Sequence, residues 1–338
     1  MIIIFTSENE LSTLQVAKLL RYYKKEFYIV NPDEDVFKFS RLNQEGIFFY
    51  HSVLKKEINF LKVTACWWRR TGLGINNFIK SHKYSEKIVK NKNHNFKELI
   101  NGKENPLSSE FKDLREYIFQ RVFETAEINL GHPKLFGLNR LNILNLANNY
   151  GLKAPNYEVV SNANQIPKSK FIGNLFVTKA ISNGLYNLVD GKSYYTYTEL
   201  QSKNAFKGKN INLFPSLLME VIEKKFEIRS FYIDGKFYSM AIFSQSNEQT
   251  EVDFRKYSET KPNKTEPYKL PDEIEIKLDK LFKQIGLNTG SVDLIVDNNN
   301  EYVFLEINPV GQYGMTSEPC NYNLDNVIAN FLIYGTIS

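Results

Sequence analysis

The first part of the chain alternates apolar and polar segments at strand and helix spacings. An apolar run, Ile2 to Phe5, predicts a buried strand. Ser7 and Glu10 match a Ser-x-x-Glu capping box, and apolar positions from Leu11 to Leu20 continue as one face of a helix. Further strands are expected at 28–30, 46–50 and 63–68. Strand, helix and strand in this order predict a small open α/β domain.

The middle of the chain shows a second mixture of helix and strand patterns after a polar stretch. Residues 80–110 are rich in Lys and Asn, and we interpret them as a partly helical surface excursion. Helices are expected over 111–130, ended by Gly131-His132-Pro133, and over 138–150, capped by Gly151. Strands are expected at 157–160, 171–180 and 185–189, with a hairpin turn at Asp190-Gly191.

The last third has the clearest pattern. A strand at 217–222 leads to a hairpin over 226–243, with Asp234-Gly235 as its two-residue turn. A polar loop over 245–271 is followed by an amphipathic helix, 272–285, which ends at Gly286. A second hairpin and a helix over 324–334 complete the pattern. We therefore expect an α/β protein in three parts, 1–133, 134–215 and 216–338.

Composition narrows the class of protein. The 338 residues are 42% hydrophobic and 24% charged, which excludes disorder as the dominant state. The net charge of +5 arises from mixed signs, so it admits an anionic ligand without requiring a nucleic acid or a membrane. Cys66 and Cys320 are expected to be free thiols, and neither a signal peptide nor a membrane-spanning window is found. A soluble cytoplasmic protein is the expectation.

The sharpest chemical signal is the second hairpin, 290–309. If Asn299-Asn300 is its two-residue turn, Asp293 lies opposite Glu306, and Asn308 shares their face. Facing carboxylates repel unless a cation lies between them, and oxygen ligands of this kind suit Mg²⁺. The alternative is a solvated polar face. The other face would pack on a core through Val292, Leu294, Val296, Leu305 and Ile307.

Two basic residues stand at strand positions where they could meet an anion. Lys179 ends an apolar strand beside the loop Ser182-Asn183-Gly184, where it can pair with phosphate oxygens, and it is otherwise an ordinary edge-strand Lys. Arg229 falls opposite Met240 and shares a face with Glu227. A cation among apolar residues needs an anionic partner, which is either a ligand's phosphate or carboxylate or a salt bridge within the protein.

Two shorter motifs carry weaker signals. Trp67-Trp68-Arg69-Arg70 ends a predicted strand and suits stacking on bases, or else a core-edge Trp pair whose arginines bond carbonyl and carboxylate groups. Asp253-Phe254-Arg255 lies in the long polar loop. The four His residues show no metal-ligand spacing, and we interpret them as surface residues.

Taken in order, these segments resemble the ATP-grasp superfamily. More closely, they resemble the ATP-grasp peptide maturases that make graspetides, which include the microviridin-type ligases and the maturases of grasp-with-spasm systems. The resemblance covers most of the chain and rests on Trp67 to Arg70, the helix around Arg140, the Lys179 strand, and segments 223–229, 253–255 and 304–312 with the upstream Asp293. It implies an ATP-grasp fold with an N-terminal open α/β domain, a central lobe and a C-terminal lobe.

The resemblance also implies which residues form the site. ATP would lie between the central and C-terminal lobes with Mg²⁺. The residues implied to contact the nucleotide are Lys179, Arg140, Met219, Glu220, Ile222 and Glu227. Those implied to hold the metal are Asp293, Glu306 and Asn308. Arg229 and Arg255 would face the transferred phosphoryl group or the acceptor carboxylate, and Arg69, Arg70 and Asp253 would contact substrate. Arg140 stands where many relatives have Lys, and the expected Gly-rich loop is reduced to Ser182-Asn183-Gly184.

The implied activity is ATP-dependent macrocyclisation of a ribosomal precursor peptide with a leader and a core. Asp or Glu side chains of the peptide would be activated as acyl phosphates and joined to Ser or Thr hydroxyls, or to Lys amines. The hairpin around Asp190-Gly191 is one candidate surface for the leader, and homodimers are common in the family. Two alternatives stay open: an ATP-grasp ligase that adds a free amino acid to a carboxylate or protein tail, and a non-catalytic nucleotide or nucleic-acid binder.

Overall fold

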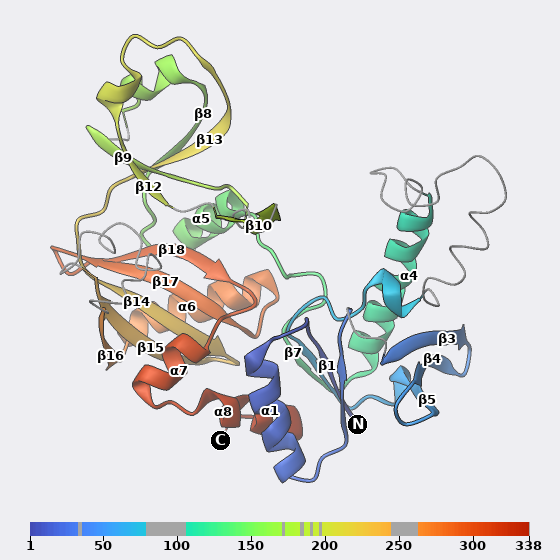
Figure 1. Cartoon of the computed structure of the whole chain (residues 1–338). Helices are drawn as coiled ribbons and strands as arrows, with labels where there is room; N and C mark the ends of the chain where they lie inside the picture. The colour runs from blue at the N-terminus through green and yellow to red at the C-terminus, as the bar shows by residue number, and fades with distance from the viewer. Residues whose placement is uncertain are drawn as a thin grey trace, which may run out of the picture. The chain divides into compact units, whose positions relative to one another are not determined.

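The computed structural model describes residues 1–32, 36–78, 106–170, 173–182, 186–189, 192–195, 198–244 and 263–337 (Figure 1). The chain divides into two compact units. Unit 1 is Met1–Phe136 together with Asn323–Ser338, and unit 2 is Gly137–Tyr322. The three-part division expected from the sequence stays a prediction. Among the described residues, no helix has the length and apolar character that a membrane span needs.

Unit 1 contains a parallel sheet with flanking helices, in agreement with the open α/β domain expected there. Its strand order is β2 (Phe27–Val30), β1 (Ile2–Phe5), β6 (Ala65–Trp68) and β7 (Ile128–Leu130). Helix α4 (Pro106–Thr125) packs on one face, because its Ile118 and Val122 share a core with Phe5 and Trp68. Helices α1 (Leu11–Tyr22) and α8 (Leu324–Tyr334) pack against each other, and α8 also contacts β6 and β7.

Two local expectations for unit 1 are wrong, and one sheet is larger than expected. Residues 128–130 form strand β7 rather than the end of a helix, since α4 ends at Thr125. Glu10 directly precedes α1 without capping it, so the Ser7–Glu10 capping box does not form. The 46–50 strand is the middle of an antiparallel sheet that also contains two unpredicted strands. Its members are β3 (Phe37–Asn43), β4 (Gly46–His51) and β5 (Lys56–Asn59), with the 3-10 turns η1 (Phe60–Lys62) and η2 (Ile75–Asn77) nearby.

Unit 2 begins with α5 (Arg140–Asn149) and a four-stranded antiparallel sheet. Gly151 follows the helix with φ +72°, a conformation that suits glycine. The strand order is β12 (Glu199–Ser202), β9 (Leu175–Lys179), β13 (Asn212–Glu220) and β8 (Tyr157–Asn162). The 3-10 turns η3 (Ala163–Lys168) and η4 (Lys203–Phe206) flank it, and β10 (Tyr186–Val189) pairs with β11 (Lys192–Tyr195). Val160, Ile166, Phe176 and Leu218 form the small core of this region.

The second sheet of unit 2 has five antiparallel strands. Their order is β16 (Lys264–Tyr268), β15 (Lys236–Phe243), β14 (Lys224–Ile233), β17 (Thr289–Asp297) and β18 (Tyr302–Asn308). Helix α6 (Asp272–Ile285) covers one face, where Phe282 stacks on Tyr232 with ring centroids 4.1 Å apart. Helix α7 (Gly314–Cys320) covers part of the other face, where Cys320 packs with Met240 and Ile242. The Asp234-Gly235 turn is confirmed, because Ile233 pairs with Lys236.

The β17–β18 hairpin contains the predicted Asp293–Glu306 pair, although its turn and its register toward the turn differ from those predicted. Asp293 does pair with Glu306, but Val296 pairs with Tyr302 and Leu294 with Phe304, so one extra residue, Leu305, sits in a bulge. The turn is correspondingly a three-residue loop closed by a bond from Asp297 N to Glu301 O. Because of the bulge, the fully buried Phe304 takes the core position that the sequence suggested for Leu305.

Candidate functional site

One face of the five-stranded sheet gathers the charged residues singled out in the sequence. In adjacent strands, Arg229 pairs with Asp293, and Asp293 pairs with Glu306. Glu227 and Asn308 lie two residues along their strands, so they share this face. Ile228, Ser230 and Tyr232 point to the opposite face, where α6 packs. The charged residues therefore all lie on the face opposite α6.

Both carboxylates that are predicted to bind the metal are paired with basic side chains of the protein. Arg229 Nη1 lies 3.0 and 3.1 Å from the two carboxylate oxygens of Asp293, and both side chains are buried. Glu306 Oε2 lies 2.8 Å from Lys179 Nζ and 2.7 Å from Arg140 Nη2. Burial by itself raises the pKa of Glu306, but the charges of Lys179 and Arg140 outweigh it and hold this pKa well below its ordinary value.

Glu227 forms a separate buried pair on the same face. Lys224 Nζ lies 2.5 Å from its Oε1, and the Ser244 hydroxyl donates to the same oxygen at 3.0 Å. Burial raises the pKa of Glu227 above its ordinary value; Lys224 and Ser244 favour the ionised form and reduce the rise, while the charge of Asp293 adds to it. Glu227 is therefore held in an ion pair within the protein.

Two of the arginines have unsatisfied donors at the site. The Nε atoms of Arg140 and Arg229 are buried and have no hydrogen-bond partner among the described residues. Arg140 also donates from Nη1 to the carbonyl of Ser182 at 3.2 Å, in the short loop after β9. A buried, unpaired N–H is costly, and an oxyanion is the partner that a guanidinium accepts best. These orphaned donors fit a phosphate-bearing ligand.

The residues present also fit Mg²⁺ in the company of phosphates. The described residues contain no group of three or more His, Cys, Asp or Glu side chains placed to hold a metal ion. Asp293, Glu306 and Asn308 offer two carboxylates and one amide oxygen on neighbouring strands. Mg²⁺ in nucleotide enzymes characteristically takes one or two carboxylates and completes its shell with water and phosphate oxygens. This donor set therefore suits a metal that arrives with a nucleotide better than a metal held by protein alone.

The first sheet of unit 2 supplies an apolar surface next to Lys179. Lys179 pairs with Leu217, and Val177 pairs with Met219, so these four residues share one face of β9 and β13. Phe176 and Leu218 point the other way, into the small core. A flat apolar surface that ends in a lysine suits a base and its phosphates. Leu217 and Met219 are both buried on this face.

The connection between β13 and β14 exposes backbone groups beside this surface. Val221, Ile222 and Glu223 lie in neither strand, and no backbone–backbone hydrogen bond joins them to other described residues. The resemblance implies backbone contacts to adenine at Glu220 and Ile222. Ile222 lies in this connection, whereas Glu220 ends β13 and its N donates to Asn156 O at 3.0 Å. The adenine role of both residues remains a proposal.

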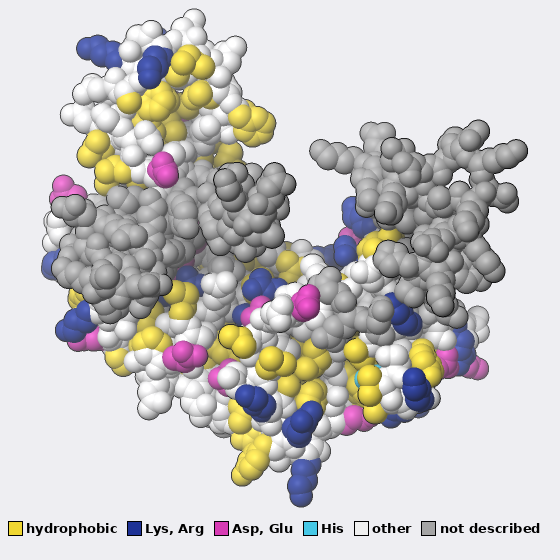
Figure 2. All heavy atoms as spheres, viewed as in Figure 1, with side chains coloured by type: hydrophobic (Ala, Val, Ile, Leu, Met, Phe, Trp, Pro, Cys, Tyr) yellow, Lys and Arg dark blue, Asp and Glu magenta, His cyan; other side chains and the backbone are white. Residues whose placement is uncertain are grey.

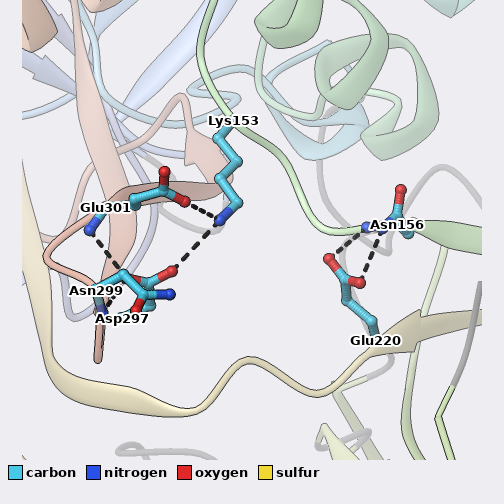
Figure 3. A network of polar contacts seen from close by, with 6 residues as sticks. All are labelled: Lys153, Asn156, Glu220, Asp297, Asn299 and Glu301. Atoms are coloured by element: carbon cyan, nitrogen blue, oxygen red, sulfur yellow. Dashed lines mark hydrogen bonds and ion pairs between the residues drawn. The ribbon is translucent and has the colours of Figure 1, made fainter.

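Two polar clasps hold the neighbouring segment between α5 and β8 (Figure 3). The Glu220 carboxylate accepts from the backbone N and the side-chain Nδ2 of Asn156, each at 2.9 Å. Lys153 Nζ contacts the carboxylates of Asp297 and Glu301 at the β17–β18 turn. In addition, Lys153 O accepts from Phe304 N at 2.7 Å. This segment is thus tied both to the end of β13 and to the edge strand β18.

The remaining predicted site residues lie elsewhere. Arg69 and Arg70 belong to unit 1, where both contact the carboxylate of Glu10 at 3.1 and 2.8 Å. Trp67 and Trp68 are buried, so this motif has the geometry of the structural alternative, a core-edge Trp pair with arginines on a carboxylate. Asp253 and Arg255 lie outside the described residues.

Sequence reasoning missed three residues that the structure places at or beside the site. Lys224 was visible as a basic residue three positions before Glu227, but its burial was not. Ser291 and Asn156 carried no signal in the sequence, because a lone Ser on a strand and a lone Asn after a Pro are common. On the face of the molecule that Figure 2 shows, basic and acidic side chains are interspersed, in line with the mixed charge of the sequence.

Comparisons with known proteins place this geometry in a known fold. No protein-family model matches the sequence, and no curated protein matches it. Among solved structures, a Chryseobacterium gregarium RiPP-associated ATP-grasp ligase, in complex with ADP and a leader and core peptide, has a TM-score of 0.76 at 22% identity, covering 99% of this chain and 97% of that one.

Two further structures agree over similar lengths. The macrocyclase MdnC from Microcystis aeruginosa MRC, bound with precursor peptide MdnA, has a TM-score of 0.69 at 21% identity, covering 99% of both chains. The ATP-grasp ligase PsnB, complexed with a minimal precursor variant, Mg and ADP, has a TM-score of 0.67 at 15% identity, covering 98% of this chain and 97% of that one. Over almost its whole length, the chain therefore has the fold of the ATP-grasp ligases.

Proposed function

We propose that this protein is an ATP-dependent, ADP-forming ligase that makes macrocycles in a ribosomal precursor peptide. The observation that carries the proposal is the convergence on Glu306 of Lys179 from the first sheet and Arg140 from α5, beside the Arg229–Asp293 pair. This puts three cations and two carboxylates at one place in an ATP-grasp fold. The three solved structures of the same fold are named for acting on, or were solved with, precursor peptides.

The proposed reaction has two steps. A side-chain carboxylate of the peptide attacks the γ-phosphorus of ATP, which forms an acyl phosphate and releases ADP. A Ser or Thr hydroxyl, or a Lys amine, of the same peptide then attacks the acyl carbon; its proton is lost and inorganic phosphate leaves. The peptide forms one ester or amide bond and loses the mass of one water per ring.

The chain's own residues have defined tasks in this proposal. Lys179 and Arg140 bind phosphate oxygens. Both contact Glu306 in the structure, and they can exchange this carboxylate for a phosphate because either anion forms ion pairs of this length. Arg229, with its orphaned Nε, neutralises charge on the phosphoryl group or the acceptor carboxylate. Met219, Val177 and Leu217 exclude water from the base. Asp293, Glu306 and Asn308 would hold Mg²⁺, which supplies charge neutralisation at the phosphates when bound.

A mass-spectrometric assay tests the proposal. Peptides encoded by short reading frames next to the gene would be incubated with the protein, ATP and Mg²⁺, and then weighed. A loss of one or more waters that depends on ATP supports macrocyclisation. With ¹⁸O in the Asp and Glu side chains of the peptide, the proposed acyl phosphate requires one ¹⁸O to appear in the released phosphate for each ring.

The same assay separates the alternatives. A mass gain by one amino-acid residue, when free amino acids are supplied, would replace the macrocyclase by a ligase for free amino acids. ATP-independent water loss, or ¹⁸O that stays wholly in the peptide, would contradict activation as an acyl phosphate. The matched inactive protein is Glu306→Gln, and Glu318→Gln, on the exposed surface of α7, is the control that should retain full activity.

A further inference from the structure

A fourth polar side chain completes the metal-facing block of the β17–β18 hairpin. Ser291 pairs with Asn308, and two residues further on Asp293 pairs with Glu306. The Leu305 bulge lies beyond these pairs, so Ser291 and Asp293 point to the same face as Glu306 and Asn308. On the other side, Ser291 pairs with Phe231 of β14. On this face its neighbours are therefore Phe231 and Asn308 on the adjacent strands and Asp293 two residues along its own strand.

The Ser291 hydroxyl is buried without a partner. Ser291 is 1% exposed, and its Oγ has no hydrogen-bond partner among the described residues. The segment after β18 approaches the backbone at this position: a Cβ built on Gly311, whose φ is +56°, would lie 3.1 Å from Ser291 N. A buried hydroxyl with no partner costs more than an alanine of similar shape would at the same place. Packing alone therefore does not account for a serine here.

The neighbouring serines show what a structural hydroxyl looks like in this sheet. On the α6 side, the Ser230 hydroxyl lies 2.7 Å from the Ser239 hydroxyl, so each has a partner within the protein. Ser244, also buried, donates to Glu227 at 3.0 Å. Ser291 lacks such a partner and stands on the face that carries the proposed metal ligands. Its missing partner is therefore to be sought among the groups that enter with the nucleotide.

We propose that Ser291 is a positioning residue of the metal site, whose hydroxyl bonds a water in the shell of Mg²⁺ beside Asn308. The inference rests on the proposed function, because it assumes that Asp293, Glu306 and Asn308 hold the metal. Mg²⁺ at such a site keeps several waters, and each needs acceptors or donors from the protein. An alcohol can donate and accept, so it can bond such a water.

The experiment compares Ser291→Ala with Ser230→Ala. Binding of Mn²⁺, as a spectroscopic substitute for Mg²⁺, would be followed by electron paramagnetic resonance with ADP present. Thermal unfolding of the metal-free protein would be recorded in parallel. For Ser291→Ala we expect Mn²⁺ affinity to fall by about tenfold, the low end for loss of an outer-shell partner, while unfolding stays the same or moves to higher temperature. Ser230→Ala should show the reverse, a lower unfolding temperature with Mn²⁺ affinity unchanged.

The outcomes separate this inference from the proposed function. If the wild-type protein binds Mn²⁺ with ADP and Ser291→Ala binds it equally well, the role of Ser291 is wrong and the site stands. If Ser291→Ala lowers the unfolding temperature of the metal-free protein and leaves Mn²⁺ affinity unchanged, the hydroxyl is structural and the inference is again wrong. If the wild-type protein itself binds no Mn²⁺ with ADP, the proposed metal site fails, and the inference fails with it.

Discussion

At the scale of single residues, the site is a problem of charge balance. Lys179, Arg140 and Arg229 bring three cations to a sheet face on which Asp293 and Glu306 bring two carboxylates. The excess positive charge and the two orphaned Nε atoms favour a further anion. A nucleotide with its metal would satisfy both the cations and the carboxylates, because phosphate oxygens pair with the cations and the metal binds the carboxylates.

The first prediction concerns the carboxylates. Glu306→Gln keeps the volume and one acceptor oxygen but removes the charge that pairs with Lys179 and Arg140. Ring formation should fall by about a hundredfold or more, the scale seen when one group that stabilises transferred charge is lost. Asp293→Asn should behave alike. The readout is the rate of water loss by mass spectrometry, with circular dichroism to show that both variants fold. Near-normal rates in folded protein would rule out both metal ligands.

The second prediction concerns Glu10 in unit 1. Burial raises the pKa of Glu10, but Arg69, Ser12 and Arg70 outweigh it and lower this pKa to about 2. A lowered carboxylate pKa stabilises the fold above the ordinary pKa, and that stability is lost as the pH falls from about 4.5 through 2. After allowance for solvent screening, the free energy of unfolding of unit 1 should fall by about 2 kcal/mol over this range.

Urea unfolding at pH 7, 5 and 3 measures the effect. In Glu10→Gln the loss of stability between pH 5 and pH 3 should be smaller than in the wild type, because no carboxylate remains there to be protonated. Glu57→Gln is the matched control, since Glu57 pairs with Arg41 on the exposed surface of the same unit. Equal pH dependence in Glu10→Gln and the wild type would show that the Arg69–Glu10–Arg70 cluster does not stabilise the fold.

At the scale of elements, strands and turns were easier to predict than side-chain partners. The Asp234-Gly235 hairpin and the helix over 324–334 follow from local turn chemistry and from apolar spacing, and the structure confirms both. The Asp293–Glu306 pairing was reached with a turn one residue too short, and the Leu305 bulge restores the register. The extra residue in the turn and the extra residue in the bulge offset each other, and an alternating sequence pattern reveals neither of them.

Partners that come from distant segments could not be predicted. Glu10 lies 59 positions before Arg69, and Arg140 lies 166 positions before Glu306. No local rule links such residues, so the sequence indicated charged groups without saying which would meet. Likewise β3 and β5 were missed, because their polar residues hide the alternation that marks a strand.

The third prediction concerns the clasp in Figure 3. Asn156→Ala removes the bond from Nδ2 to Glu220 and leaves the backbone bond, so the end of β13 is held less firmly. Since this strand leads into the backbone groups proposed to contact adenine, ADP affinity should fall about threefold, as expected for one hydrogen bond. Calorimetric titration with ADP measures it. Asn164→Ala is the control, because its amide in η3 bonds the Asn210 side chain on the exposed surface outside the strands. An unchanged affinity in Asn156→Ala would separate the clasp from the nucleotide.

At the scale of the whole molecule, unit 1 is assembled from two distant stretches of chain. The α8 side chains Leu324, Ile328 and Leu332 are at most 1% exposed, and Tyr23 donates to Asn326 at 2.7 Å. Burying each such Leu or Ile is worth about 2 kcal/mol or more. That sum is comparable with the whole stability of a typical domain.

The fourth prediction follows from this assembly. Removal of residues 323–338 should unfold or strongly destabilise unit 1, while unit 2 retains its structure and its ADP binding. Hydrogen exchange read by mass spectrometry distinguishes the units, since amides of β1 and β6 should lose protection and amides of β14 and β17 should keep it. Protection retained throughout unit 1 would show that α8 is dispensable for its fold.

The same arrangement bears on how the chain folds during synthesis. All residues of unit 2 lie between Gly137 and Tyr322, whereas unit 1 cannot be completed until residues 324–334 have left the ribosome. Domains commonly fold in the order of their synthesis. Here that order is inverted: unit 2 can reach its native state first, while the part of β6 and β7 that α8 contacts stays open to a chaperone until α8 has been synthesised.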